Sequence, residues 1–304
     1  MDDAQPSQRP TKPARRERLR HQKVALTNRA TATVERLEQQ RSASRFIDVG
    51  FAMYEGDRAR GGSLLAGALA FRFFMLLVPY VVVMMAGFGF AADAAEQSSR
   101  TLANRAGIEG LAAKAISNLS TLSTGQRIVI LTIATVALFS GARALVRALR
   151  LTSTLLWAIP VQPRRGAARE ALVFIGAVTL SLVVGDLLGR ARAQSFTLGL
   201  ILTLAAVGLP AAMALGLWSK LPHDPRALWT AHWPGALLFG IAVQGLHLFT
   251  VLYLARSFTT KSETYGALGS AIAILLWAYI LGRSVVLAIG LNVAAFRDLN
   301  KVDL

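Results

Sequence analysis

Long stretches of apolar residues that carry almost no charge dominate this chain between residues 64 and 296. A helix needs about 20 mainly apolar residues to cross the hydrocarbon core of a bilayer. Six segments meet that requirement: residues 64–91, 127–149, 170–189, 196–218, 234–256 and 267–296. Because the runs are continuous, without the alternation of a strand, they predict helices. The expected fold is all-α, a polytopic membrane helical bundle of about six transmembrane helices.

The composition agrees with a membrane protein and removes several kinds of chemistry. Only 16% of the 304 residues are charged, against about 25% in an average soluble protein, and the mean hydropathy is +0.46. No cysteine is present, so disulfides, thiolate metal sites and cysteine nucleophiles are excluded. The first and last spans are longer than the bilayer needs, so they tilt, kink or project beyond it. Pro79 is a candidate kink in the first span.

The segment before the first span divides into a polar tail and a short amphipathic stretch. Residues 1–45 are basic, interrupted by prolines and without the apolar core of a cleavable signal peptide. They predict a largely disordered cytoplasmic tail, which either adheres to anionic head groups or is only solvated and helps to set the topology. Residues 46–56 fit a short interfacial helix. The six-span transmembrane domain is expected over residues 46–297, followed by a short cytoplasmic tail at 298–304.

The positive charge is concentrated in the segments that a cytoplasmic side would hold. The net charge is +16 and the sequence pI about 11.3, which in a soluble protein would suggest nucleic acid. In a membrane protein, Lys and Arg gather in cytoplasmic segments. With both termini inside, the inner segments hold 23 Lys and Arg and the outer segments 8; without residues 1–63, the inner segments hold 10. The expected location is the bacterial inner (plasma) membrane, with residues 92–126 outside and 150–169 inside, and no nucleic-acid partner is expected.

The polar residues offer little for catalysis. His21 lies in the tail, His223 and His232 flank an inner loop, and only His247 lies in a span. No motif of a hydrolase, metalloprotease or nucleotide-binding loop is present, and no spacing brings several metal ligands together. The chain is therefore not expected to be an enzyme, and no catalytic residue, metal or cofactor is expected.

Two arginines within the apolar segments are the strongest candidates for a function. Arg283 lies near the middle of the last predicted span, and Arg72 lies about two turns into the first. An arginine near the bilayer centre costs about 2.5–3.5 kcal/mol on insertion scales. Arg72 either snorkels to the inner head groups or contacts a ligand. Arg283 either forms a structural pair, with Asp186 as the candidate ion partner or with carbonyls of the spans, or faces the interior of the helix bundle or a wet cavity. Further polar residues of the spans, which serve either as interhelical hydrogen-bonding groups or as part of the same site, are Gln244, His247, Ser284 and Asn292.

Several short motifs of the chain resemble one family of membrane proteins. The matching residues are Ala68-Leu69-Ala70-Phe71 through Pro79, Trp157, Pro160, Pro163, Arg164 and Arg165, Pro234-Gly235-Ala236-Leu237, Tyr265-Gly266-Ala267-Leu268-Gly269, Leu275-Leu276-Trp277-Ala278-Tyr279, and Asn292. Together they resemble the YihY/BrkB family of bacterial inner-membrane proteins, in the form of its YhjD-type members. The resemblance implies a six-span helical fold with both termini inside. The family once carried a ribonuclease BN label and has been discussed as virulence factors or candidate transporters of lipid-like molecules; nothing in this sequence supports a ribonuclease.

The chain departs from the family pattern at three polar positions. Arg72 stands near a place where the family tends to have aromatic hydroxyls, and Arg283 stands where it normally has a small or apolar residue. Gly290 stands where the family usually has a Glu, two residues before Asn292. The polar lining has thus exchanged an acid for two bases, which favours an anionic ligand over a proton or cation route.

Two hypotheses for the function follow. In the first, the protein is transporter-like and moves or accommodates an amphipathic anionic molecule such as a lipid. The residues expected to contact its head group are Arg283, Arg72, Gln244, His247, Asn292 and Tyr265. In the second, it is a non-transporting membrane scaffold or lipid-interacting envelope protein, and its arginines are structural. Membrane lipids, above all anionic ones, are the expected partners.

Overall fold

The structure of the protein, a computed structural model, describes residues 38–39, 44–94, 123–161, 167–191, 196–250 and 255–300. The chain divides into two compact units, Met1–Ala52 and Met53–Leu304. Of the first unit, the described residues are 38–39 and 44–52. Most of the predicted tail at 1–45 and most of the predicted outer connection at 92–126 therefore lie outside the described residues.

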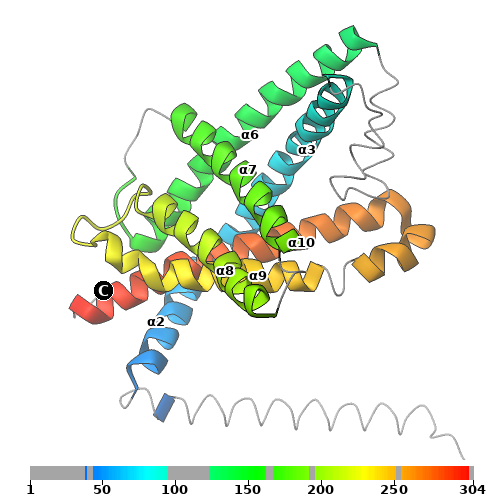
Figure 1. The fold of residues 1–304 in the computed structure, drawn as a ribbon. Coiled ribbons are helices and arrows are strands. Elements are labelled where there is room, and N and C mark those ends of the chain that lie inside the picture. The colour runs from blue at the N-terminus through cyan, green and yellow to red at the C-terminus, as the bar shows by residue number, and fades with distance from the viewer. Residues whose placement is uncertain are drawn as a thin grey trace, which may run out of the picture. The chain divides into compact units, whose positions relative to one another are not determined.

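Every regular element in the described ranges is a helix. In chain order these are α2 (Arg45–Ala59), α3 (Gly62–Ala94), α6 (Thr124–Trp157), α7 (Ala167–Ala191), α8 (Phe196–Trp218), the short 3-10 helix η1 (Trp229–His232), α9 (Trp233–Phe249) and α10 (Ala255–Asn300) (Figure 1). The predicted all-α fold is confirmed. Each predicted span overlaps one of the long helices, and the short helix predicted before the first span is α2.

The ends of two helices differ most from the predicted spans. α6 continues to Trp157, well beyond the predicted end at residue 149. Its apolar residues continue on one face, where Leu149 and Leu156 are buried, and the arginines that suggest a loop lie on the other faces of the same helix. α10 begins at Ala255 and so includes residues 257–266, which lie between two predicted spans.

Local chemistry accounts for several helix ends. At the start of α6, the Ser123 hydroxyl accepts a hydrogen bond from the Gln126 backbone N–H, and the Gln126 side chain accepts one from the Ser123 N–H. This reciprocal arrangement is a capping box. α6 is followed by Ala158 in a left-handed conformation, with a φ of 54°, and then by Pro160, which does not continue a helix. Gly61 separates α2 from α3 with a φ of 65°, which glycine adopts without a steric penalty.

The six long helices in the described part of the second unit pack in a closed order of neighbours. α3 packs against α6 and α10, α6 against α7, α7 against α8, α8 against α9, and α9 against α10 (Figure 1). Small residues allow close approach: a Cβ on Gly282 of α10 would lie only 2.7 Å from the Ala66 carbonyl oxygen and 3.2 Å from the Ala70 nitrogen of α3. Between α8 and α9, a Cβ on Gly240 would lie 2.9 Å from the Ala211 Cβ. Small residues at such contacts are typical of helices that associate within membranes.

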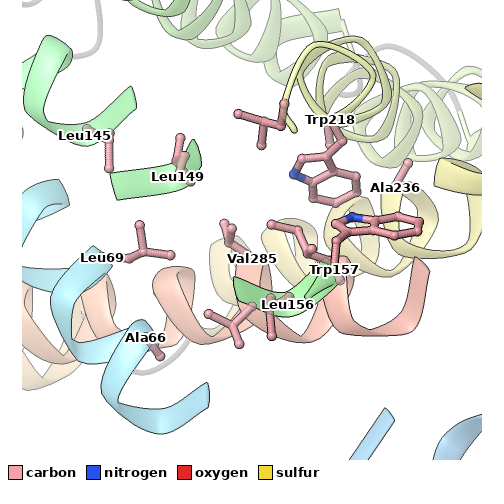
Figure 2. Close-up of a cluster of buried hydrophobic side chains, with 14 of the residues drawn as sticks. Ala66, Leu69, Leu145, Leu149, Leu156, Trp157, Trp218, Ala236 and Val285 are labelled. Atoms are coloured by element: carbon pink, nitrogen blue, oxygen red, sulfur yellow. The ribbon is translucent and has the colours of Figure 1, made fainter. Parts of the chain in front are cut away.

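A cluster of buried hydrophobic side chains joins these helices. Figure 2 shows Leu69 of α3 facing Leu145 and Leu149 of α6. Trp157, at the end of α6, and Trp218, at the end of α8, belong to the same cluster. These contacts fix the end of α6 against the neighbouring helices.

Many other large hydrophobic side chains of the same helices are exposed. Val78 of α3, Val136 of α6 and Val173 of α7 are each more than half exposed. Among the described residues, three helices are long and apolar enough to cross a membrane, Gly62–Gly87, Thr124–Trp157 and Ile272–Leu299, and Ala205–Trp218 is a shorter apolar helix. Soluble proteins rarely leave so much contiguous apolar surface in water, whereas lipid chains cover it in a membrane.

Candidate functional site

Arg283 of α10 forms an ion pair with Asp57, near the end of α2. Its Nη1 donates a hydrogen bond to Asp57 Oδ1 and its Nη2 donates one to Oδ2, each at 2.7 Å. The side chains of Arg283 and Asp57 are 29% and 11% exposed. Gly62, the first residue of α3, lies against the pair, because a Cβ there would overlap the Asp57 carboxylate and lie 3.2 Å from Arg283 Nη1. Two parallel bonds between charged groups form the strongest kind of ion pair, so the charge of Arg283 is already matched within the chain.

The pair also shows how far along the bundle Arg283 lies. The sequence places Arg283 near the middle of the last span, but its guanidinium lies beside Gly62, level with the beginning of α3. α10 has 46 residues and is about 69 Å long at 1.5 Å per residue. Because the helix is much longer than a bilayer is thick, a position in the middle of its apolar run does not have to lie in the middle of the membrane. The guanidinium is therefore neutralised at one end of the first predicted span.

The acid that Arg283 contacts is Asp57, whereas the sequence offered Asp186 as the candidate partner. Asp186 lies in α7, and its side chain is outside the described part of the chain. Asp57 is missed by sequence reasoning because it lies before the apolar segments and 226 positions away from Arg283. One feature of the sequence could have indicated Asp57: it is an acid one turn before the pair Gly61-Gly62, just before the start of the first predicted span.

Asn292 of α10 supports the start of α9. Its side chain is 1% exposed, and its Oδ1 accepts a hydrogen bond of 2.7 Å from the backbone N–H of Gly235. Gly235 lies in the first turn of α9, where backbone N–H groups have no acceptor within the helix. His232, at the N-cap, supplies no side-chain hydrogen bond. Asn292 therefore caps α9 from a neighbouring helix, which is the interhelical hydrogen-bonding role expected for it from the sequence.

Arg72 has a different environment. It is exposed on α3, and no acid in the described parts of the chain pairs with it. Phe71 and Met75, beside it on the same helix, are 51% and 46% exposed. The Arg72 guanidinium thus lies next to apolar surface on a helix long enough to cross a membrane.

A row of arginines runs along α6. Arg143 and Arg147, one turn apart, are exposed, and the Arg143 guanidinium lies over the Phe139 ring at 5.8 Å from its centroid. Arg150, about one turn further, has a side chain only 11% exposed and forms an ion pair with Glu170 of α7. The row is therefore neutralised at Arg150, whereas Arg143 and Arg147 have no acid partner within the described ranges.

His232 is buried in a cluster of aromatic rings. Its side chain is 1% exposed, and its ring centroid lies 4.8 Å from that of His223 and 6.0 Å from that of Trp157. Neither ring nitrogen has a hydrogen-bond partner among the described residues. Burial, and to a lesser extent the neighbouring His223, lower the pKa of His232 to about 4. The ring is therefore neutral near pH 7, and the cluster is a packing element at the junction of α6, η1 and α10.

The remaining residues of the predicted head-group site are spread over two helices. Gln244 is half-buried and His247 is exposed, both in α9. Tyr265 lies in α10, and its side chain is outside the described part of the chain. The contacts of the described residues join neither Gln244 nor His247 to Arg72 or Arg283, so a common site formed by all six residues stays a prediction.

The described ranges contain no group of three or more His, Asp or Glu side chains that could hold a metal ion. The chemistry that the described geometry supports is electrostatic: exposed guanidinium groups on apolar helices, which attract anions. The absence of catalysis stays a prediction.

Long apolar helices, exposed apolar faces and close contacts through small residues define this chain as an integral membrane protein of the all-α class. A family model described as "Virulence factor BrkB" matches residues 53–302. Because the match covers most of the chain, the protein belongs to the BrkB family, and the resemblance to YihY/BrkB proteins is confirmed. No curated protein and no solved structure matched the chain.

Proposed function

We propose that the protein is transporter-like and accommodates or moves an anionic amphipathic molecule, such as a phospholipid, with Arg72 as a head-group contact. The observation that carries the proposal is the exposed guanidinium of Arg72, which has no acid partner in the described ranges. A charged arginine within a span costs about 2.5–3.5 kcal/mol on insertion scales. An anionic head group offsets that cost, because guanidinium binds phosphate through two parallel hydrogen bonds.

The surface around Arg72 suits the apolar part of such a molecule. Leu64, Phe71, Met75 and Val78 of α3 are between 46% and 79% exposed. These side chains extend to both sides of Arg72 along the helix and offer contact to acyl chains. A ligand with an anionic head and an apolar tail therefore matches both the charge and the surface of α3.

Arg283 and Asn292 have structural roles in this proposal. A free anion would have to compete with the Asp57 carboxylate, which already holds both Nη atoms of Arg283 at 2.7 Å. The Asn292 Oδ1 is occupied by the Gly235 N–H. The head-group role that the sequence gave first to Arg283 therefore passes to Arg72. The setting of the proposal is the bacterial inner membrane, with six spans and both termini in the cytoplasm.

A second candidate function is a non-transporting membrane scaffold that holds lipid without moving it. The paired state of Arg283 and the capping role of Asn292 favour it, because both residues stabilise contacts between helices. In that case Arg72 would anchor a resident lipid. The two candidates differ in whether lipid crosses the membrane.

The test is movement of lipid in proteoliposomes that contain the full-length protein. A fluorescent phosphatidylglycerol analogue should cross faster than in protein-free vesicles and faster than a phosphatidylcholine analogue. Arg72→Gln should reduce the rate by about tenfold, the factor that corresponds to about 1.4 kcal/mol, whereas Arg226→Gln, at an exposed position of an inter-helix loop, should not. No acceleration by the wild type would contradict transport and favour the scaffold, and a full rate with Arg72→Gln would remove Arg72 from the head-group role.

A further inference from the structure

We propose that Trp229 and Trp233, at the start of α9, form a membrane-interface surface, with their indole rings at the boundary between the lipid head groups and the acyl chains. The partner is the bilayer itself, which this surface contacts without the need for a specific bound lipid. The inference therefore goes beyond the proposed function, which concerns a head group held by Arg72.

The first observation is an exposed apolar stripe along α9. Four large side chains of this helix are between 50% and 56% exposed: Trp233, Leu237, Ile241 and Leu248. At about 100° per residue, the four lie within about 80° of one another around the helix. The buried residues of α9 lie outside this arc, on the sides where the helix packs against α8 and α10. Within a membrane the stripe faces acyl chains, and Trp233 is its first residue.

The length of α9 places Trp233 close to an edge of the hydrocarbon core. α9 has 17 residues, so it is about 25 Å long at 1.5 Å per residue. The hydrocarbon core of a bilayer is about 30 Å thick. A helix of this length crosses most of the core only when both of its ends lie near the core's boundaries. The first residue of α9 is therefore expected near one of them.

The segment before α9 changes from charged to apolar surface. Lys220 and Arg226, in the connection between α8 and η1, are exposed. Leu228 and Trp229, which follow, are 71% and 58% exposed. Basic side chains next to a bilayer are attracted to anionic head groups, whereas the exposed stripe of α9 suits acyl chains. Trp229 lies between these two kinds of surface.

The chemistry of tryptophan suits this position. An indole ring combines a large apolar body with one N–H donor, and tryptophan is enriched where a membrane meets water. Two other tryptophans of the chain have a different environment: Trp157 and Trp218 are 5% and 3% exposed and belong to the buried cluster (Figure 2). Trp229 and Trp233 are exposed where charged surface gives way to apolar surface, which matches the two layers of a lipid interface.

Buried contacts fix the backbone on both sides of Trp233. His232, directly before it, is 1% exposed, and its ring centroid lies 6.0 Å from that of Trp157. Gly235, two residues after it, donates its backbone N–H to Asn292 Oδ1. The two exposed indoles therefore extend from a packed segment of the fold, so their positions relative to the bundle are set.

The experiment measures quenching of tryptophan fluorescence in proteoliposomes of the full-length protein, made from phosphatidylcholine and phosphatidylglycerol. The emission that is lost in the double variant Trp229→Phe with Trp233→Phe belongs to these two residues. Lipids brominated on the part of the acyl chain near the head group should quench most of this emission. Lipids brominated near the chain end should quench less of it, and iodide in the water should quench little. The emission lost in Trp218→Phe, at a buried position, is the control and should be shielded from iodide.

Two results would overturn the inference. Strong quenching by iodide without quenching by brominated lipid would place the two indoles in water. Protection from both quenchers would mean that protein covers them, which would favour contact with a second copy of the chain or with another protein.

A second measurement decides if the double Phe variant does not fold. The chain has no cysteine, so Arg226→Cys and Ile241→Cys each carry a single fluorescent label. The label at Arg226→Cys should be quenched by iodide. The label at Ile241→Cys, about 12 Å further along α9 than Trp233, should be quenched by lipids brominated near the chain end. Iodide quenching at Ile241→Cys, or the reverse order of the two positions, would overturn the inference. Neither measurement depends on Arg72 or on movement of lipid, so the inference and the proposed function fail separately.

Discussion

Two regions of the molecule carry arginines on apolar helices, and they differ in whether the arginine side chain has a carboxylate partner. The first, the α10 junction, consists of Asp57, Arg283, Asn292 and His232. Here the arginine forms an ion pair with Asp57, Asn292 and His232 are buried, and Asn292 also accepts a hydrogen bond from a backbone N–H. The second consists of Arg72 on α3 and of Arg143 and Arg147 on α6, whose side chains are exposed and have no acid partner among the described residues. An arginine in an apolar segment therefore indicates a ligand site only where the chain does not already supply the anion.

Breaking the ion pair at the α10 junction should have the largest effect. Asp57→Asn and Arg283→Gln each leave one shielded group without its partner, at a cost of about 3–5 kcal/mol in buried pairs. The lower end of that range is expected, because the Arg283 side chain is 29% exposed. The double variant removes both charges and should be more stable than either single variant. Denaturant unfolding in detergent measures the effect, and a double variant whose loss is the sum of the two single losses would show that the residues do not act as a pair.

Acid should weaken the same junction through His232. Its pKa is lowered from 6.5 to about 4 in the folded protein, so between these values the unfolded chain binds a proton that the folded chain does not. The unfolding free energy should therefore fall as the pH decreases from about 6.5 to about 4 and lose up to about 3 kcal/mol, at 1.36 kcal/mol per pKa unit. His232→Gln should lack this part of the pH dependence. Identical profiles for the wild type and His232→Gln would contradict the assignment.

A methyl group at the ion pair should have a smaller effect. The Cβ of Gly62→Ala would overlap the Asp57 carboxylate, and overpacking of this kind costs about 1–3 kcal/mol. Gly67, in the same helix, has nothing within 4 Å of its Cβ position, so Gly67→Ala should be neutral or stabilising by up to about 1 kcal/mol. Thermal unfolding of the two variants compares the close contact with the open position. Equal losses in both would mean that the contact at Gly62 does not matter.

Removing the charge of Arg72 should affect stability least. No described acid depends on it, so Arg72→Gln should change the unfolding free energy by no more than about 0.5 kcal/mol, as for other exposed positions. Delipidated protein is the appropriate sample, because bound lipid adds its own stabilisation. A loss as large as that of Arg283→Gln would show that Arg72 also has a partner in the chain, and the contrast between the two regions would disappear.

The helices could be predicted closely from the sequence because continuous apolar runs leave few alternatives. The predicted span at 196–218 coincides with α8 (Phe196–Trp218). The apolar run of the second span ends at residue 149, and the sequence also allowed the helix to continue past it along the membrane surface. α6 does continue, to Trp157, with Leu149 and Leu156 on its buried face. The end of the helix was hard to fix because an amphipathic continuation loses the hydropathy of a span but keeps the periodicity of a helix.

The candidate site could be predicted only in part. Arg72 and Arg283 are visible in the sequence as charges among apolar residues, but whether each has a partner depends on contacts between distant positions. Asp57 is 226 positions from Arg283, and the Gly235 N–H is 57 positions from the Asn292 side chain that caps it. A single sequence carries the residue types but not these pairings, so it does not distinguish the paired Arg283 from Arg72.

The central claim is that an anionic lipid is held by Arg72 and not by Arg283. The most direct measurement is the amount of phosphatidylglycerol that co-purifies with the wild type, with Arg72→Gln, and with the double variant Asp57→Asn and Arg283→Gln. The double variant is the matched control, because it removes the guanidinium of Arg283 without leaving an unpaired acid. Arg72→Gln is predicted to lose most of the retained lipid, while the double variant keeps the wild-type amount. Full retention by Arg72→Gln together with loss in the double variant would contradict the account.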